Sequence, residues 1–274
     1  MLSSEYSLEC GVRQGGITSP KLFNLYVDEL IGGLSGMHAG CYVGSTCINN
    51  ISYADDMVLL SPSVGALVQL LETCEEYATA HGLVYNPKKS EVIIFKAGNI
   101  KPYYVPPILL HGTPLKVVES VKYLGHILSS DMNDDLDIDR ERRALSVRSN
   151  MLARRFARCS YDVKVTLFKA YSQSFFSSSL WVRYTKRAYS ALRVQYNNAF
   201  RMLLGLPSRC SASGMFAEAR TDGFQAVMRK RIVALWSRIR KSTNSILNAI
   251  AWRFDCPIAE YWMSQTKGVA QWEL

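Results

Sequence analysis

The chain has 274 residues, of which 48% are hydrophobic and 20% are charged. That balance is typical of a globular protein with one large domain or two smaller ones, and it excludes general disorder. The formal net charge is +9, which favours an acidic partner, either nucleic acid or an anionic membrane, over a basic protein without such a partner.

Cysteine usage and the start of the chain bear on the compartment. The seven cysteines include no CxxC pair, so we expect neither a disulfide framework nor a zinc finger, and a reducing intracellular setting, nucleus or cytoplasm. The start, MLSSEYSLEC, has no basic region and no apolar region of a signal peptide, so we do not expect secretion. The apolar stretch FFSSSLWV is too short and too serine-rich to span a bilayer.

The first predicted element is a helix over residues 19–31. Ser19 is a good N-cap, Pro20 suits the first helical position, and apolar residues recur at helical spacing. We expect Gly32 and Gly33 to end this helix.

Two strands, a second helix and a third strand follow. CYVGSTCI and ISYADDMVLL are rich in β-branched and aromatic residues, which predicts strands. Residues 64–80 form an amphipathic pattern with Gly82 as a plausible C-cap. LVYNPKKSEVIIF predicts a turn at Asn86 and Pro87 before a strand. With one more strand in front, this order is the β-α-β-β-α-β arrangement of ferredoxin-like domains.

The pattern changes after a proline-rich loop at 102–107. LLHGTPLKVV and SVKYLGHILS predict a short strand pair, and helical signals dominate from Asp134 onward. We therefore predict an α+β protein with a boundary near Ser130, dividing residues 1–130 from a mostly α-helical region at 131–274.

Two adjacent aspartates, Asp55 and Asp56, interrupt the apolar run ISYADDMVLL. In a straight buried strand, neighbours point to opposite faces, so each face would bury a carboxylate at a cost of several kcal/mol. Two explanations remain: a tight turn that reaches solvent, or a bound metal ion. The absence of glycine and the strand formers on both sides weaken the plain turn.

Four motifs in order give the chain a family resemblance. GVRQGG at 11–16, YADD at 53–56, NPKKSE at 86–91 and VKYLGHIL at 121–128 together resemble the reverse transcriptases of non-LTR (LINE-class) retrotransposons, from blocks B to E. YADD alone is a weak signal, whereas the ordered set is specific. The later region resembles the family's thumb more loosely, through phrases such as VKVTLFKAYS and NNAFRMLLGLP.

The resemblance implies a partial polymerase palm, ferredoxin-like with its first strand missing, and then a thumb-like region. YADD would be a hairpin tip, with Asp55 the main ligand and Asp56 a supporting ligand of Mg²⁺ or Mn²⁺. In such enzymes a 3′-hydroxyl attacks the α-phosphate of a nucleotide while two metal ions about 3.5–4 Å apart stabilise the oxygens. The implied partners of the full-length protein are an RNA template, a DNA primer and deoxynucleotides, with no membrane.

The same resemblance assigns residues in two further motifs. Arg13, Gln14 and Gly15 would contact the template and the incoming nucleotide, although the glycines also suit a flexible loop. Lys89 would act near the leaving pyrophosphate, as a charge or as a proton donor, whereas we expect Lys88 to be solvated.

VKYLGHIL resembles the primer-grip hairpin of the family. Tyr123, Leu124 and Gly125 would contact the primer, and we expect Tyr123 and Leu124 also to pack in the core. His126 is expected to be structural.

An acidic run, DMNDDLDID, follows the last motif. It does not fit a calcium loop, because Leu136 stands where glycine is needed and Arg142 where the bidentate glutamate is needed. We expect its carboxylates to lie in the first turn of a helix, where the helix dipole favours them.

Most lysines and arginines lie after Arg140, where acidic residues are sparse. A one-signed surface repels itself unless a polyanion is near, so this region predicts weak nucleic-acid binding without strong sequence preference. The interleaved aromatic residues are expected mostly in the core, with base stacking as the alternative. They are Tyr171, Trp181, Tyr184 and Tyr196.

The sequence departs from the family ahead of GVRQGG. The family carries there an aspartate that bridges both metal ions, but nothing before Asp28 is an aspartate. We therefore expect a fragment of an RNA-directed DNA polymerase that is inactive alone, with its metal bound only in a complete site. It would be a piece of a gene model, a decayed copy, or, as the alternative function, a non-catalytic nucleic-acid-binding module with a reverse-transcriptase-like fold.

Overall fold

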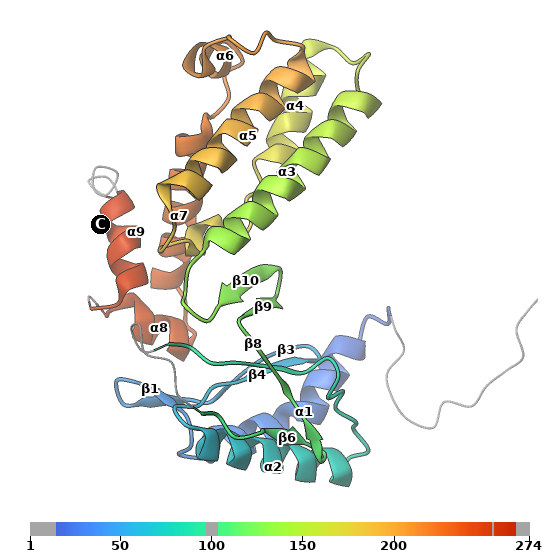
Figure 1. Cartoon of the computed structure of the whole chain (residues 1–274), viewed down its shortest axis with the longest axis vertical. Helices are drawn as coiled ribbons and strands as arrows, with labels where there is room; N and C mark the ends of the chain where they lie inside the picture. The colour runs from blue at the N-terminus through green and yellow to red at the C-terminus, as the bar shows by residue number, and fades with distance from the viewer. Residues whose placement is uncertain (1–14, 97–103, 254, 267–274) are drawn as a thin grey trace, which may run out of the picture. The chain divides into compact units, whose positions relative to one another are not determined.

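The computed structural model describes residues 15–96, 104–253 and 255–266 (Figure 1). The chain divides into two compact units. Unit 1 comprises Met1–Val92 and Pro102–Lys116, and unit 2 comprises Ile93–Lys101 and Val117–Leu274. The predicted domain boundary near Ser130 stays a prediction.

The first helix of unit 1, α1 (Ser19–Gly36), begins where the sequence predicts but ends later. Thr18, not Ser19, is its N-cap. The prediction that Gly32 and Gly33 end the helix is wrong. The apolar stripe continues past the glycines to Leu34, which is fully buried, and that burial outweighs the roughly 1 kcal/mol that each interior glycine costs.

The second helix, α2 (Val64–Ala80), has the predicted bounds. The Ser63 side chain accepts a hydrogen bond from the backbone N–H of Ala66, and this cap defines the start. Gly82 follows the helix with φ of 65°, the left-handed conformation that commonly ends helices.

The strands of unit 1 form short antiparallel ladders. CYVGSTCI and LLHGTPLKVV, each expected to be one strand, form hairpins, so these two predictions are wrong, whereas the hairpin that the resemblance implies at YADD is observed. In CYVGSTCI the turn contains Gly44, with φ of 64°, a conformation that strand periodicity does not reveal. The paired strands are β1 (Cys41–Val43) with β2 (Thr46–Ile48), β3 (Asn50–Tyr53) with β4 (Asp56–Leu59), and β6 (Leu109–Leu110) with β7 (Thr113–Pro114).

Both helices of unit 1 pack on one face of the β3–β4 ladder (Figure 1). Met57 and Leu59 are two residues apart on β4, so their side chains share a face. They pack against a cluster that includes Leu34 of α1 and Leu70 of α2. This core leaves the hairpin tip, at the other end of the strands, outside the packed region.

Two further ladders follow along the chain. β5 (Glu91–Ile93) pairs with β8 (Lys116–Val118). In unit 2, β9 (Ser120–Tyr123) and β10 (His126–Ser129) form a hairpin.

The β9–β10 hairpin closes through a two-residue turn. Leu124 and Gly125 have φ of 44° and 84°, as a type I′ turn requires. The expected core packing of Leu124 is wrong, because this turn leaves its side chain 44% exposed.

The rest of unit 2 is helical, which confirms the predicted α+β class. Phe168, Tyr196 and Phe200 form the centre of its core, with ring centroids about 5 Å apart. Trp181 is also buried, whereas Tyr171 is exposed. The helices are α3 (Asp135–Arg155), α4 (Tyr161–Ser172), the 3-10 helix η1 (Ser178–Leu180), α5 (Lys186–Leu204), α6 (Ala212–Glu218), α7 (Phe224–Arg240), α8 (Ser245–Ala251) and α9 (Pro257–Thr266).

Among the residues that the structure describes, no helix combines the length and the apolar character needed to cross a bilayer.

Candidate active site

Asp55 and Asp56 lie at the tip of the β3–β4 hairpin. Tyr53 pairs with Asp56 across the ladder, so Ala54 and Asp55 form a two-residue turn. Both carboxylates are exposed, and no metal ion is therefore needed to offset a burial cost. The explanation by a solvent-exposed turn holds, and that turn presents two adjacent carboxylates.

The hairpin tip carries backbone strain. Ala54 has φ of 53°, in the left-handed region that costs a residue with a Cβ roughly 1 kcal/mol or more. Glycine would adopt this conformation without that cost. Such strain is often found at functional sites, and here it lies directly before Asp55.

The donor chemistry of the tip suits a hard cation in part. Mg²⁺ takes oxygen ligands and keeps several waters, so two carboxylates provide part of a site. Within residues 15–96, 104–253 and 255–266, no group of three or more His, Cys, Asp or Glu side chains is arranged to hold a metal ion. Asp55 and Asp56 thus fit the role of partial ligands.

Lys89 lies in a turn after α2. The Asn86 side-chain oxygen accepts the backbone N–H groups of Lys88 and Lys89 at 3.1 and 3.3 Å, a local cap typical of asparagine turns. The Lys89 side chain is exposed. In the described part of the chain it makes no hydrogen bond or ion pair with Asp55, so its predicted role stays a prediction.

The glycine-rich motif is only partly described. Arg13 and Gln14 lie outside the described residues. Gly15 is exposed with φ of 79°, and a Cβ built on it meets nothing within 4 Å. The positive φ therefore favours glycine at this position, although there is enough space for a larger side chain.

The predicted primer-grip residues surround the β9–β10 turn. Tyr123 is half-buried and pairs with His126, while Leu124 and Gly125 form the turn itself. His126 is structural, as expected, because its Nδ1 lies 3.0 Å from a carboxylate oxygen of Asp137.

Asp137 is a buried carboxylate that the sequence analysis missed. Its side chain is fully buried, although the acidic run was expected only to occupy the first turn of a helix. Burial raises its pKa, but the cations and hydrogen-bond donors around it outweigh that effect and hold the pKa well below its usual range.

The signal for this cluster lies in helical spacing. Asp137 and Glu141 are four residues apart, so they share a face of α3. Arg140 and Arg148 contact this pair, with Arg148 Nη2 2.5 Å from Glu141 Oε1. A carboxylate pair on the apolar face, with arginines one and two turns away, would have predicted the buried network.

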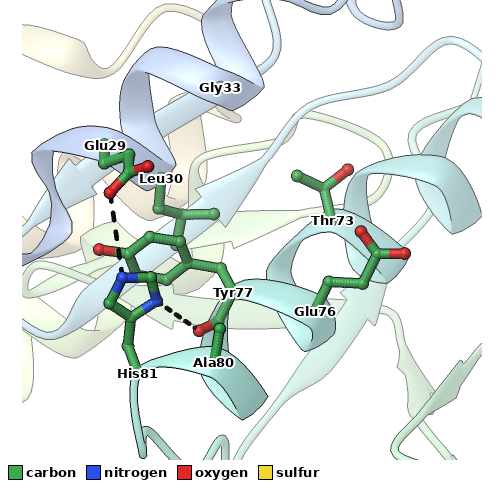
Figure 2. Close-up of a pocket in the computed structure, with 8 residues that line it drawn as sticks. All are labelled: Glu29, Leu30, Gly33, Thr73, Glu76, Tyr77, Ala80 and His81. Atoms are coloured by element: carbon green, nitrogen blue, oxygen red, sulfur yellow. Dashed lines mark hydrogen bonds and ion pairs between the residues drawn. The ribbon is translucent and has the colours of Figure 1, made fainter.

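A groove of about 360 Å³ lies between α1 and α2 (Figure 2). The His81 ring stacks on Tyr77 at a centroid distance of 3.8 Å, and its Nε2 lies 3.9 Å from Glu29 Oε2. The residues that line the groove include none of the predicted site residues. They are Glu29, Leu30, Gly33, Thr73, Glu76, Tyr77, Ala80 and His81.

Comparison with known proteins finds similarity to a polymerase family in the first half of the chain. Residues 2–128 match the family model of reverse transcriptase (RNA-dependent DNA polymerase). A "Retrovirus-related Pol polyprotein from type-1 retrotransposable element R2" of Popillia japonica is 32% identical over 126 residues, covering 44% of this chain and 21% of that protein. The "Retrovirus-related Pol polyprotein from type-2 retrotransposable element R2DM" of Drosophila melanogaster is 36% identical over 87 residues, covering 32% of this chain and 8% of that protein.

The family-model match includes all four motifs, because GVRQGG begins at residue 11 and VKYLGHIL ends at residue 128. The chain spans about a fifth of the length of the Popillia polyprotein. Residues 2–128 therefore match the reverse transcriptase family model and are similar to the polyproteins of R2 retrotransposable elements.

Proposed function

We propose that this chain contributes the two-aspartate hairpin of an RNA-directed DNA polymerase whose full-length form copies RNA into DNA. The observation that supports this is the exposed pair Asp55 and Asp56, at a strained hairpin tip within a segment that matches the reverse transcriptase family. In this proposal both aspartates hold Mg²⁺ or Mn²⁺, which when bound stabilises charge on the transferring phosphate.

The remaining predicted residues would position the substrates. Lys89 would supply positive charge, or a proton, beside the departing pyrophosphate, where fixed charge lowers the barrier. Arg13, Gln14 and Gly15 would hold the template and the nucleotide. The β9–β10 turn would contact the primer, so that its 3′-hydroxyl lies in line with the α-phosphate.

We propose that the 274-residue polypeptide alone does not extend a primer. Two carboxylates on one turn leave a two-metal site short of a ligand from another strand, and losing such electrostatic stabilisation commonly costs orders of magnitude in rate. The test is primer extension on an RNA template with Mg²⁺ or Mn²⁺. Robust extension by the polypeptide would overturn this part of the proposal.

A chimera makes the aspartate role testable. The chain would be joined to the preceding polymerase segment of a related element, and extension measured with and without Asp55→Ala. We expect the chimera to extend the primer and the substitution to reduce its rate at least about a hundredfold. Lys88→Ala is the matched control on an exposed side chain with no assigned role. An active chimera that Asp55→Ala leaves unchanged contradicts the metal role.

A second candidate function, a non-catalytic nucleic-acid-binding module, is favoured by the charge distribution of unit 2. Several exposed arginines make no ion pair with a carboxylate among the described residues. Such cations suit contacts with phosphates, which release counterions and weaken steeply with salt. Binding of an RNA–DNA duplex without polymerase activity, even in the chimera, would favour this function. The arginines are Arg154, Arg155, Arg187, Arg193, Arg229 and Arg238.

A further inference from the structure

The β9–β10 hairpin is attached to α3 through one buried carboxylate. The backbone N–H of Ile127 donates to Asp137 Oδ1 at 3.0 Å. His126 Nδ1 lies 3.0 Å from Asp137 Oδ2, and the His126 side chain is only 12% exposed. Two successive residues of the hairpin therefore contact the same side chain, directly after the predicted primer-grip turn.

The same carboxylate holds a third segment, the region around η1. Ser177 Oγ and Trp181 Nε1 each donate to Asp137 Oδ2 at 2.7 Å. Arg140 Nε donates to Oδ1, also at 2.7 Å, from the next turn of α3. Asp137 thus joins the hairpin, α3 and the η1 region in a site without solvent access, where charged hydrogen bonds are strongest.

The η1 side of this joint has further hydrogen bonds to α3. Asp134 Oδ2 accepts the backbone N–H groups of Val182 and Arg183 at 2.7 and 2.8 Å, and Asp135 Oδ1 accepts that of Thr185 at 2.8 Å. Weakening the bonds from the η1 side to Asp137 should therefore leave that segment attached to α3.

The geometry points to Asp137 and His126 as positioning residues for the nucleic acid that the hairpin contacts. His126 pairs with Tyr123 and so closes the two-residue turn of Leu124 and Gly125. Any shift of His126 relative to α3 moves this turn with it. The position of the turn on unit 2 thus depends on the close contact between His126 Nδ1 and Asp137 Oδ2, together with the Ile127 hydrogen bond. The ligand in this inference, a primer–template duplex, rests on the proposed function.

Three substitutions separate this role from general stability. His126→Phe keeps an aromatic ring but removes the nitrogen that faces Asp137. His126→Asn returns a nitrogen donor at a position close to that of Nδ1 and should rescue the contact. Ser177→Ala is the matched control, because it removes a 2.7 Å donor from the same Asp137 oxygen on the η1 side.

The first measurement is hydrogen exchange of the 274-residue protein, followed over peptides that cover residues 120–129. We expect His126→Phe to reduce amide protection there by about tenfold or more, because the polar contact with Asp137 is lost. His126→Asn should restore most of the protection, and Ser177→Ala should leave it within about twofold. Hairpin protection that is unchanged in His126→Phe overturns the inference.

The second measurement is affinity for an RNA–DNA duplex with a recessed DNA 3′ end. We expect His126→Phe to weaken binding severalfold, His126→Asn to restore it, and Ser177→Ala to leave it unchanged. If His126→Phe reduces the protection of the hairpin but leaves the affinity for the duplex unchanged, the positioning role is overturned. If the wild-type protein does not bind the duplex, the primer contact that the proposed function assigns to the turn fails, and hydrogen exchange alone still decides whether the joint exists.

Discussion

At the scale of single residues, two kinds of carboxylate have opposite surroundings. Asp55 is exposed at a turn, so its position costs little and suits a ligand from solution. Asp137 is fully buried, and its free energy depends on the donors that surround it. Removing one partner of such a buried charged network commonly costs 3–5 kcal/mol, because the partner left behind stays desolvated.

Asp137 should make the stability of the protein sensitive to acid. Its pKa in the folded protein is held below the unfolded value of about 3.9. Its contribution is therefore fully present above about pH 4 and is lost as the pH falls further. We expect Asp137→Asn to lower the free energy of unfolding by roughly 3 kcal/mol at pH 7, and by less at pH 3. Urea unfolding followed by circular dichroism measures both values.

Asp139, two residues after Asp137 on the same helix, provides the control for this prediction. Asp139 makes ion pairs with Arg142 and Arg143, but its side chain is 44% exposed. Exposed pairs contribute about 1 kcal/mol or less, so Asp139→Asn should have a small effect at both pH values. An equal loss in the two variants would contradict the assignment of acid sensitivity to the buried site.

At the scale of elements, α1 shows where apolar packing overrides a local signal. The helix passes through Gly32 and Gly33 because Leu34 is buried against α2. A Cβ added at Gly32 meets nothing within 4 Å, and its φ is not in the left-handed region. We expect Gly32→Ala to raise the free energy of unfolding by about 0.5–1 kcal/mol, measured by urea unfolding.

A matched glycine should respond in the opposite direction. Gly125 also has open space around its Cβ position, but its φ is 84°, so alanine there is strained. Gly125→Ala should lower the stability of unit 2. A stabilising effect of Gly125→Ala, or none from Gly32→Ala, would show that conformational freedom is not what distinguishes the two sites.

An element could be predicted from the sequence where the residues at both of its ends and its apolar periodicity all indicate the same structure. The bounds of α2 follow from the Ser63 cap, one apolar stripe and Gly82. The backbone conformations of the hairpin turns could not be predicted, since Ala54 and Leu124 have positive φ values that neither residue type indicates. The carboxylate spacing on α3 indicates a buried network, but its donor Trp181 could not be predicted, because it lies 44 residues from Asp137. The aspartate tip was predictable because its carboxylates exclude a buried straight strand.

At the scale of the whole molecule, the arginines that contribute to the net charge of +9 have two different roles. Some arginines of unit 2 neutralise buried carboxylates, as Arg148 does for Glu141. Others, such as Arg229, are exposed and have no acidic partner among the described residues. The composition alone does not distinguish these roles, because both kinds of arginine count equally toward the net charge.

Arg148→Gln and Arg229→Gln should therefore have different consequences although each removes one positive charge. Arg148→Gln should lower the free energy of unfolding by roughly 3 kcal/mol, because Glu141 stays buried with one cation fewer. Arg229→Gln should leave stability unchanged. If Arg229 contacts a phosphate, its loss should also reduce the slope of log affinity against log salt by about 1.

Fluorescence anisotropy of a labelled RNA–DNA duplex, titrated at salt concentrations from about 50 to 200 mM, gives that slope for each variant. Because the nucleic acid supplies the counterions that are released, the slope depends on phosphate contacts and not on fold stability. If the affinity of the wild-type protein does not change across this range of salt concentrations, the electrostatic interpretation of unit 2 is contradicted. A smaller slope for Arg148→Gln than for Arg229→Gln would mean that the buried pair, and not the exposed arginine, governs contact with the polyanion.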